Sequence, residues 1–359
     1  MAIRLKPIEE QVIVITGASS GIGLTTARMA AARGARVVIA SRDNDALATI
    51  EQQIREQGGK AIHVMADVGS EDEIRAIADA AIQSFGGFDT WVNNAGVSIY
   101  GRIDQVSMED HRRLFETNYW GVVQGSCVAL EQLRDRGGAI INIGSVASDR
   151  ALPLQGAYSA SKHAVKAFTD ALRMELEADG APVSITLIKP GSVDTEFERH
   201  ARNYMDTEPN LPPPVYAPEL VAKAILHAAQ YAVRDLYVGG GGRVISLSGQ
   251  MAPRLTDRMM ELVMTRAQRG GPRQDHGDSL HRPSGAEGHE RGHRHGFVRE
   301  HSLYTTAELH PWMTAAAAMG LGALAYMAVS GTGGMTRHDE NRRIADDDGA
   351  RRRYAQAAE

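Results

Sequence analysis

The sequence contains one cysteine, no excess of basic residues and no apolar leader, and each absence excludes a class of protein. Cys127 is the only cysteine among 359 residues, so an internal disulfide is excluded; because it falls in an apolar helical run, we interpret it as a core residue rather than a nucleophile. The formal net charge of −5 argues against a general nucleic-acid-binding protein. Residues 1–6 lead directly into an apolar run without the hydrophobic region of a signal peptide, so we expect a cytoplasmic protein.

Short apolar runs rich in β-branched residues alternate along the chain with longer helical stretches. The first run, residues 12–15, is followed by a glycine-rich turn and a helical stretch to about residue 33. Further strands are predicted at residues 37–40, 61–65, 90–92, 139–143, 183–188 and 236–238, and helices at 45–57, 74–85, 109–133 and around Tyr158. Strands separated by helices form right-handed βαβ units with a parallel sheet covered on both faces. The predicted fold class is therefore α/β, a doubly wound parallel sheet of the Rossmann type.

The turn after the first strand has the composition of a phosphate-binding loop. Gly17, Gly21 and Gly23 stand where the backbone must approach phosphates closely, or where a helix must pack against a strand. A tight structural turn would explain the same glycines, but their place between a strand and a helix favours binding of a dinucleotide.

The end of the second strand indicates which dinucleotide would bind, because an acidic residue there would accept from a ribose 2′-OH. Ser41 and Arg42 stand at this position, and a hydroxyl with a guanidinium favours a 2′-phosphate. We therefore predict NADP(H) in preference to NAD(H). The alternative is a solvated Arg42, or one that pairs with Asp43.

Tyr158 and Lys162 lie four residues apart, which places them on one face of a helix. Free tyrosine titrates near pH ~10, so its ionisation near neutrality needs roughly three pKa units, or about 4 kcal/mol of phenolate stabilisation. A nearby Lys162 ammonium in a partly desolvated pocket, helped by an oxidised nicotinamide, supplies that order of magnitude. Ser145, at the end of a predicted strand, would hydrogen-bond the substrate oxygen that Tyr158 protonates or deprotonates.

These elements together resemble the short-chain dehydrogenase/reductase superfamily, in its single-domain form with a Tyr-x-x-x-Lys pair, over about residues 8–240. The closest likeness is to bacterial oxidoreductases of this superfamily that carry a C-terminal extension. The resemblance implies that Asn118 supports a water-linked proton relay beside Ser145, Tyr158 and Lys162. It implies a cofactor site made by Gly17, Ser19, Ser20, Gly21, Ile22, Gly23, Ser41, Arg42, Asp67, Val68, Asn94, Ala95, Gly96, Tyr158, Lys162, Pro190, Gly191, Val193 and Thr195. Taken singly, Asn94 or its neighbour Asn93 could merely cap a turn, and Asn118 could be a buried amide bonded to backbone.

The resemblance places the substrate loop between Ser192 and Pro214. Its apolar members are Phe197, Tyr204, Met205, Leu211 and Pro212 to Pro214, and they favour an apolar carbonyl substrate. The same side chains could instead pack the loop against the body, and Arg199, His200 and Arg202 could meet an acid group.

The chain after the catalytic region changes character. We divide it into a catalytic domain at 1–266, a disordered linker at 267–300, an apolar helix at 301–336 and a charged tail at 337–359. His276, His281, His289, His293 and His295 lack acidic or thiol partners at firm ligand spacing, so no metal site is predicted. Residues 312–330 are uncharged and would span about 28 Å as a helix. Their composition leaves three interpretations open: membrane association, a helix packed on a partner, or an unstable tail.

The function expected from these features is an NADP(H)-dependent oxidoreductase that interconverts a carbonyl and an alcohol by hydride transfer. We expect a homo-oligomer without nucleic-acid partners, cytoplasmic and in membrane contact through its C-terminus. The alternative is a catalytically silent NADP(H)-sensing interaction module, which the intact Ser145, Tyr158 and Lys162 disfavour.

Overall fold

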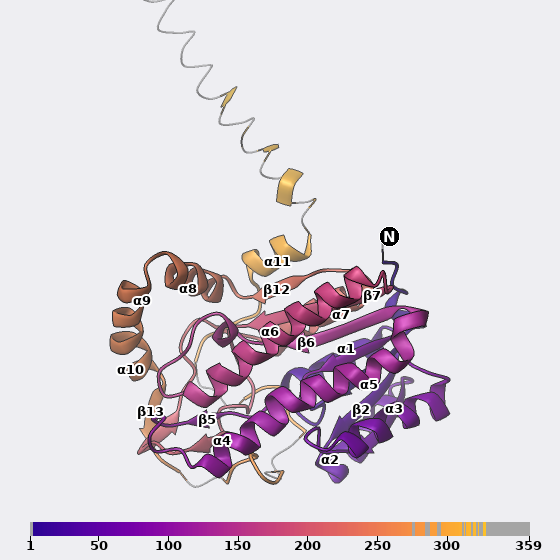
Figure 1. Ribbon diagram of the computed structural model, residues 1–359, viewed down its shortest axis with the longest axis horizontal. Helices are drawn as coiled ribbons and strands as arrows, with labels where there is room; N and C mark the ends of the chain where they lie inside the picture. Colours follow the sequence, from indigo (N-terminus) through magenta and orange to yellow (C-terminus); the bar gives the residue numbers. More distant parts are fainter. Residues whose placement is uncertain are drawn as a thin grey trace, which may run out of the picture. The chain divides into compact units, whose positions relative to one another are not determined.

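Seven parallel strands form the main sheet in the order β12-β7-β6-β4-β1-β2-β3 (Figure 1). The computed structural model describes residues 3–274, 277–283, 288–292, 296–310, 312, 314–316, 319, 320, 322, 326 and 327. The strands are β1 (Val12–Thr16), β2 (Arg36–Ser41), β3 (Lys60–Met65), β4 (Thr90–Asn93), β6 (Gly138–Ile143), β7 (Val183–Pro190) and β12 (Asp235–Val238). The α/β doubly wound fold predicted from the sequence is confirmed.

The central strands are buried throughout and mostly apolar because helices cover both faces of the sheet. All five residues of β1 are buried, as are all six of β6. The strand order reverses between β1 and its neighbour β4, and in open parallel sheets this is where ligands bind beyond the carboxyl ends of the strands.

Seven helices connect the strands of this sheet, and four more follow its last strand in the part of the chain that the structure describes. They are α1 (Gly21–Ala32), α2 (Asn44–Glu56), α3 (Glu71–Phe85), α4 (Met108–Phe115), α5 (Gly121–Arg136), α6 (Gly156–Ala178), α7 (Pro218–Gln230), α8 (Gly240–Met251), α9 (Pro253–Met259), α10 (Thr265–Ala267) and α11 (Leu303–Leu309). On one face a buried cluster joins Ile74 of α3, Val128 of α5 and Leu172 of α6 to strand residues such as Val14. On α5, Cys127 points away from this cluster and is exposed, so its interpretation as a core residue was wrong.

The helix predicted at residues 109–133 is interrupted in the structure. A π-helical turn, η2 (Glu116–Trp120), separates α4 from α5. Wide turns of this kind are rare and occur frequently at functional sites. Two 3-10 turns, η1 (Ile8–Glu10) and η3 (Val146–Ser148), and a second π-helical turn, η4 (Met260–Met264), complete the helical elements described.

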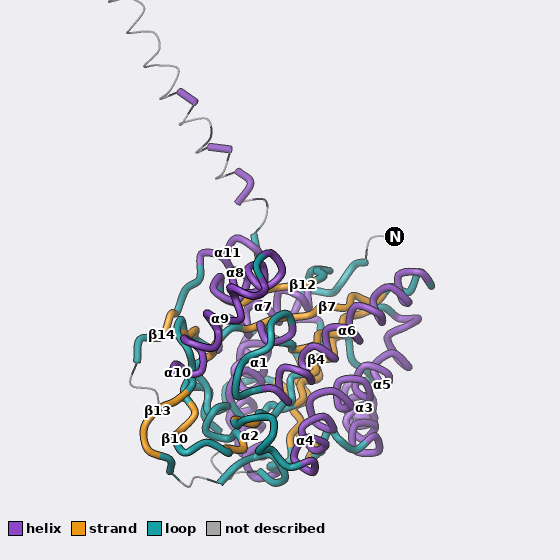
Figure 2. Tube along the Cα trace, turned by 60° about the vertical axis from the view of Figure 1, so that its left-hand side comes forward, coloured by secondary structure: helices purple, strands orange, loops and turns teal. Residues whose placement is uncertain are grey.

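Three small sheets flank the main one, and two of them include the C-terminal extension. They pair β5 (Ile99–Tyr100) with β9 (Arg202–Asn203), β10 (Thr207–Pro209) with β13 (Arg269–Pro272), and β11 (Val215–Tyr216) with both β8 (Ser192–Val193) and β14 (Val298–Arg299). Figure 2 shows β13 beside β10. Leu280, between β13 and β14, is fully buried. Where residues 267–300 are described, they therefore differ from the expected disordered linker. Backbone pairing and one buried leucine hold a stretch that is otherwise poor in apolar residues.

The chain divides into two compact units, residues 1–308 and 309–359. Most of the predicted apolar helix beyond residue 310, and all of the charged tail at 337–359, lie outside the described residues. Within the part of the chain that is described, no helix has the length and apolar character needed to cross a bilayer.

Candidate active site

A cavity of about 310 Å³ opens at the carboxyl ends of the strands and contains almost all the predicted site residues. Such volumes are typical of small-molecule pockets. Every predicted catalytic and cofactor residue lines it except Gly23 and Asn118, which lie directly behind its wall. The structure therefore brings together residues that are spread over some 180 positions of the sequence, from Gly17 to Thr195.

The glycine-rich turn leaves no space for a side chain at two of its glycines. Gly17 has φ +64°, and a Cβ there would lie 2.7 Å from the Cα of Ala95. At Gly23 a Cβ would lie 2.2 Å from the carbonyl oxygen of Gly17. The Asn94 amide donates to the carbonyls of Thr16 and Gly17, at 2.9 and 3.0 Å, and ties the end of β4 to this turn. The backbone thus forms a cradle without side chains at the N-terminus of α1, which suits a pyrophosphate. Within it, the Gly21 amide donates to the carbonyl of His289 at 2.8 Å.

Asn93 has a different role from its neighbour. Its side chain accepts from the Trp91 indole at 2.8 Å and donates to Asn142 at 2.8 Å and to Ser126 at 3.0 Å. These bonds are buried between β4, α5 and β6, so Asn93 is a structural residue of the core.

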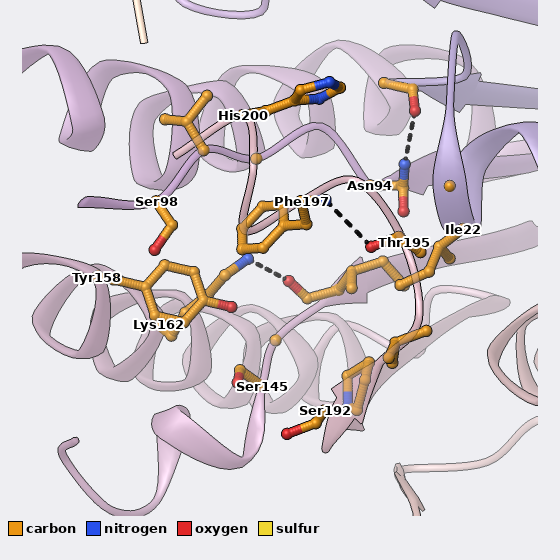
Figure 3. A pocket seen from close by; sticks show the side chains of 18 of the residues that line it. Ile22, Asn94, Ser98, Ser145, Tyr158, Lys162, Ser192, Thr195, Phe197 and His200 are labelled. Atoms are coloured by element: carbon orange, nitrogen blue, oxygen red, sulfur yellow. Dashed lines mark hydrogen bonds between the residues drawn. The ribbon is translucent and has the colours of Figure 1, made fainter. Parts of the chain in front are cut away.

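Tyr158, Lys162 and Ser145 converge on one side of the cavity (Figure 3). Tyr158 and Lys162 project from α6, and the Lys162 ammonium lies 5.7 Å from the centroid of the tyrosine ring. The ammonium donates to the carbonyl of Ile143 at 2.8 Å, which fixes it beneath the end of β6. Ser145 follows β6 and caps the η3 turn by accepting from the Ala147 amide at 3.1 Å.

Burial controls the protonation of this group. It raises the pKa of Tyr158 to about 12, against a smaller opposing effect of a hydrogen bond with Ser145. It also lowers the pKa of the Lys162 ammonium from 10.5 to about 8. Burial thus disfavours the charged form of both groups, the phenolate and the ammonium.

Asn118 lies fully buried in the π-helical turn η2. Its side chain accepts from the Val97 amide at 2.8 Å and donates to the Val97 carbonyl at 2.9 Å and to Ser161 at 3.1 Å. A Cβ at Gly96 would approach the Asn118 oxygen and the Lys162 nitrogen at 3.5 and 3.8 Å, so these groups are close neighbours. Asn118 thus ties the Val97 segment of the cavity wall to α6.

Charged groups lie at the end of the cavity that is next to β2 and β3. Arg42 and Asp67 line it where β2 and β3 end. Arg113 of α4 forms an ion pair with Asp67, and Gly69 provides the space, because a Cβ there would lie 3.0 Å from the Arg113 Nη1. Burial alone would raise the pKa of Asp67, but the Gly69 amide, Arg113 and Arg42 together hold it below its usual value. Asp43, next to Arg42, uses its carboxylate to cap α2.

The substrate side of the cavity is largely apolar. Of the loop residues predicted to contact substrate, Phe197, Leu211 and Pro212 to Pro214 line it, and the Phe197 ring centroid lies 5.9 Å from that of Tyr158. Tyr204 and Met205 instead pack beside β5, where Tyr204 donates to Asp110 at 2.7 Å. Arg199 and Arg202 form ion pairs with Glu196 and with Asp110 and Asp278. His200 remains among the lining residues.

Several lining residues were missed by the sequence analysis. Ile245 of α8 and Met264 of η4 add apolar surface, and Ser279 and Pro283 come from the extension. No motif spacing marks these positions, because they reach the cavity only through the path of the chain after β12. Among the described residues, no cluster of three or more histidine, cysteine or acidic side chains is arranged to hold a metal ion.

Comparison with known proteins agrees with this geometry. The model of the short chain dehydrogenase family matches residues 11–206. An uncharacterized oxidoreductase of Bacillus subtilis, YxnA, is 46% identical over 323 residues, which cover 89% of this chain and 91% of that protein. The alignment therefore extends well beyond the family match and into the C-terminal extension.

Two further relatives have more informative descriptions. The 3beta-hydroxysteroid dehydrogenase 1 of Eggerthella lenta is 34% identical over 249 residues, covering 65% of this chain and 94% of that protein. The solved alcohol dehydrogenase of the archaeon Thermococcus sibiricus, complexed with 5-hydroxy-NADP, is 27% identical with a TM-score of 0.56; the match covers 64% of this chain and 95% of that one.

Proposed function

This chain belongs to the short-chain dehydrogenase family, and from that premise we propose that it is an NADP(H)-dependent oxidoreductase interconverting a carbonyl and an alcohol. The observation that carries the proposal is the convergence of Tyr158, Lys162 and Ser145 in the same cavity as the glycine-rich turn. The cradle fits a pyrophosphate because any side chain at Gly17 or Gly23 would collide with backbone.

Each catalytic residue has one task in this proposal. The nicotinamide, when bound, supplies or accepts the hydride. Tyr158 exchanges the proton of the substrate oxygen through its phenol, and Ser145 holds that oxygen by a hydrogen bond. The Lys162 ammonium stabilises the phenolate by its charge. Asn118 keeps the Val97 wall in place and supports proton relay to solvent.

The proposed preference for NADP(H) rests on Ser41 and Arg42. Both line the end of the cavity where β2 stops, and Arg42 offers a guanidinium where an acidic residue would favour NAD(H). The similar Thermococcus enzyme, solved with an NADP derivative, is consistent with this assignment.

An apolar substrate is favoured by the cavity wall. Phe197, Leu211, Ile245 and Met264 contribute apolar surface, while Arg199 and Arg202 are engaged in ion pairs. The likeness to a hydroxysteroid dehydrogenase supports the same substrate class. We include steroid-like ketones among the compounds to be tested for this reason.

We further propose a cytoplasmic homo-oligomer that touches a membrane through its C-terminal segment. The helices after β12 support contact with a partner, because they expose seven large apolar side chains. Its exposed side chains are Val244, Leu247, Met251, Leu255, Met259, Leu262 and Val263. This set is called the α8–η4 face below.

The test is cofactor turnover against aliphatic, aromatic and steroid-like ketones and alcohols, with wild type and Arg42→Ala compared. Loss of one guanidinium–phosphate contact costs about 1.5 to 3 kcal/mol, or roughly ten- to a hundredfold in affinity for NADP(H). The affinity for NAD(H) should change little. A wild-type protein that prefers NAD(H) would refute the cofactor assignment. Cofactor binding without turnover on any compound of the panel would favour the alternative, a silent NADP(H)-sensing module.

A further inference from the structure

Three polar side chains line the substrate side of the cavity and have no task in the proposed mechanism. They are Ser98, Tyr100 and Gln155, which are 1%, 2% and 5% exposed. The Gln155 amide donates to the Ser98 hydroxyl at 3.2 Å and also hydrogen-bonds the Tyr100 phenol. Ser98 and Tyr158 border the same cavity (Figure 3). We call these three side chains the polar corner.

The backbone holds Ser98 and Tyr100 in fixed positions. They are two residues apart where the chain enters β5, and both line the cavity. The Ser98 carbonyl accepts from the Arg202 amide at 3.0 Å, and the Tyr100 carbonyl accepts from the Tyr204 amide at 2.7 Å. The pairing of β5 with β9 therefore pre-organises the two hydroxyls, which lowers the entropy that a ligand must lose on binding them.

Both hydroxyls retain a proton to donate. A hydroxyl that accepts a hydrogen bond, as Ser98 does from Gln155, is still one donor. In the part of the chain that the structure describes, neither the Ser98 nor the Tyr100 hydroxyl donates to a protein acceptor. Buried donors without an acceptor are unfavourable in an apolar cavity, so this wall favours a ligand atom that accepts hydrogen bonds.

The polar corner suits an acceptor without charge. Burial, followed by the nearby Glu198 and Tyr158, raises the pKa of Tyr100, so its phenol keeps its proton at neutral pH. The hydroxyl of Ser98 and the amide of Gln155 are neutral as well. Burial of a carboxylate among neutral groups is strongly unfavourable, whereas a carbonyl or hydroxyl oxygen is readily accommodated by two donors.

We propose that Ser98, Tyr100 and Gln155 form a second polar subsite, and that the substrate is an apolar ketone or alcohol carrying a second, neutral oxygen. The Ser98 and Tyr100 hydroxyls donate to that oxygen, and Gln155 holds both hydroxyls in place. Tyr100 is then a specificity-determining residue, because it binds the second oxygen and not the reacting carbonyl. This inference rests on the carbonyl–alcohol chemistry proposed above and names the substrate class within it.

The experiment measures by calorimetry the affinity of ketones for the full chain saturated with NADP⁺ or NAD⁺, whichever binds more tightly, since an oxidised cofactor cannot reduce them. The probes are a decalin monoketone, the matched diones with the second carbonyl at three different ring positions, and a matched keto acid. Wild type should bind at least one dione roughly five- to tenfold more tightly than the monoketone, and the keto acid least tightly. A monoketone bound as tightly as every dione, or a keto acid bound most tightly, would overturn the inference.

Variants of the polar corner test which groups carry the preference. Tyr100→Phe should lower the ratio of dione to monoketone affinity by about fivefold, and Ser98→Ala should lower it in the same direction. Tyr204→Phe is the matched control, because Tyr204 follows β9, donates to Asp110 and does not line the cavity. Equal losses for both ketones in Tyr100→Phe, or the same fall of the ratio in Tyr204→Phe, would show a structural role and overturn the subsite.

Turnover of the same compounds with the reduced cofactor separates this inference from the proposed function. The preference for the dione should appear in KM rather than kcat, because the second oxygen is bound alike in the ground state and the transition state. Preferential binding of a dione without turnover of any compound would refute the carbonyl–alcohol chemistry and support the subsite. Turnover of the ketones without any preference in affinity would support the chemistry and refute the subsite.

Discussion

At the residue scale, the catalytic pair is under opposing electrostatic demands. The proposed mechanism requires Tyr158 to become a phenolate, yet burial raises its pKa to about 12. It also requires Lys162 to stay cationic, yet burial lowers its pKa to about 8. The Ile143 carbonyl stabilises the charged ammonium by accepting a hydrogen bond from it at 2.8 Å. Both groups carry a cost of desolvation that a purely structural tyrosine or lysine would avoid at the surface.

We expect Tyr158→Phe to lower turnover by roughly a hundred- to ten-thousandfold, the usual contribution of a general acid or base. Binding of NADP(H) should hardly change, because only the hydroxyl is lost. Steady-state rates and fluorescence titration of NADPH give the two quantities. The control is Tyr231→Phe at an exposed tyrosine. Turnover of Tyr158→Phe within tenfold of wild type would remove Tyr158 from the mechanism.

The lowered pKa of Lys162 should also make the free energy of unfolding depend on pH. Its pKa is about 8 in the folded chain and 10.5 ordinarily, so between these values the unfolded state binds more protons and wild-type stability rises with pH. Lys162→Met lacks this dependence. The stability of the variant relative to wild type should therefore fall by about 2 kcal/mol between pH 8 and pH 9.5. Urea unfolding at both pH values measures it, and a difference that is independent of pH would contradict the depressed pKa.

At the element scale, two π-helical turns lie beside the cavity. The turn η2 carries Asn118 and interrupts the helix predicted at residues 109–133, and η4 carries Met264. A π turn adds a residue to the helical repeat, so the side chains after it face a different direction from those of an unbroken helix. In η2 this change places the Asn118 amide against the backbone of Val97.

The α8–η4 face should mediate self-association if the proposed homo-oligomer forms through it. Leu255 and Leu262 are 70% and 64% exposed, so Leu255→Glu combined with Leu262→Glu should disturb no core contact but place charge in an apolar interface. We expect a smaller sedimentation coefficient for the double variant with an unchanged melting temperature. Arg254→Glu, in the same helix, controls for added negative charge. An unchanged assembly in the double variant would exclude this face as the subunit interface.

At the scale of the whole molecule, the C-terminal extension belongs to the catalytic unit up to about residue 308. Within it, β13 pairs with β10 and β14 with β11, while Arg291 forms ion pairs with Glu219 and Glu300. Glu290 forms an ion pair with Arg28 of α1, and the Gly21 amide donates to the carbonyl of His289 at 2.8 Å. Residues far along the chain thus contact the glycine-rich turn and the helix that follows it.

Truncation at two positions should separate the contribution of the extension up to about residue 308 from that of the residues after it. A stop after His310 should leave the melting temperature and turnover close to those of the full chain, whereas a stop after Gln268 should lower the melting temperature by several degrees, because β13, β14 and buried Leu280 are lost. Calorimetry and NADPH oxidation rates measure both effects. Equal stability of the two truncated proteins would show that the extension contributes nothing to the catalytic unit.

The same pair of proteins tests the proposed membrane contact. The full chain should sediment with phospholipid vesicles and resist high salt, since apolar burial is not screened as charge attraction is. The protein that stops after His310 should stay in the supernatant. Full-length protein found wholly in the supernatant would refute the contact.

The sequence by itself determined the sheet, its helices and most residues of the cavity. Glycines that cannot bear a Cβ, continuous apolar strands and a tyrosine–lysine pair four residues apart are local patterns, and local sterics and periodicity specify their structure. The residues predicted around the glycine turn, Arg42 and Tyr158 therefore meet in one cavity.

Only the tertiary structure decided which distant groups reach that cavity. Arg42 meets Leu280 across 238 positions and Arg113 meets it across 167, and neither contact follows from any spacing in the sequence. The exposure of Cys127 and the altered pKa values of Tyr158 and Lys162 likewise depend on what packs around them. The physical reason is that burial and long-range pairing depend on the path of the whole chain, which a local pattern of apolar and polar residues does not encode.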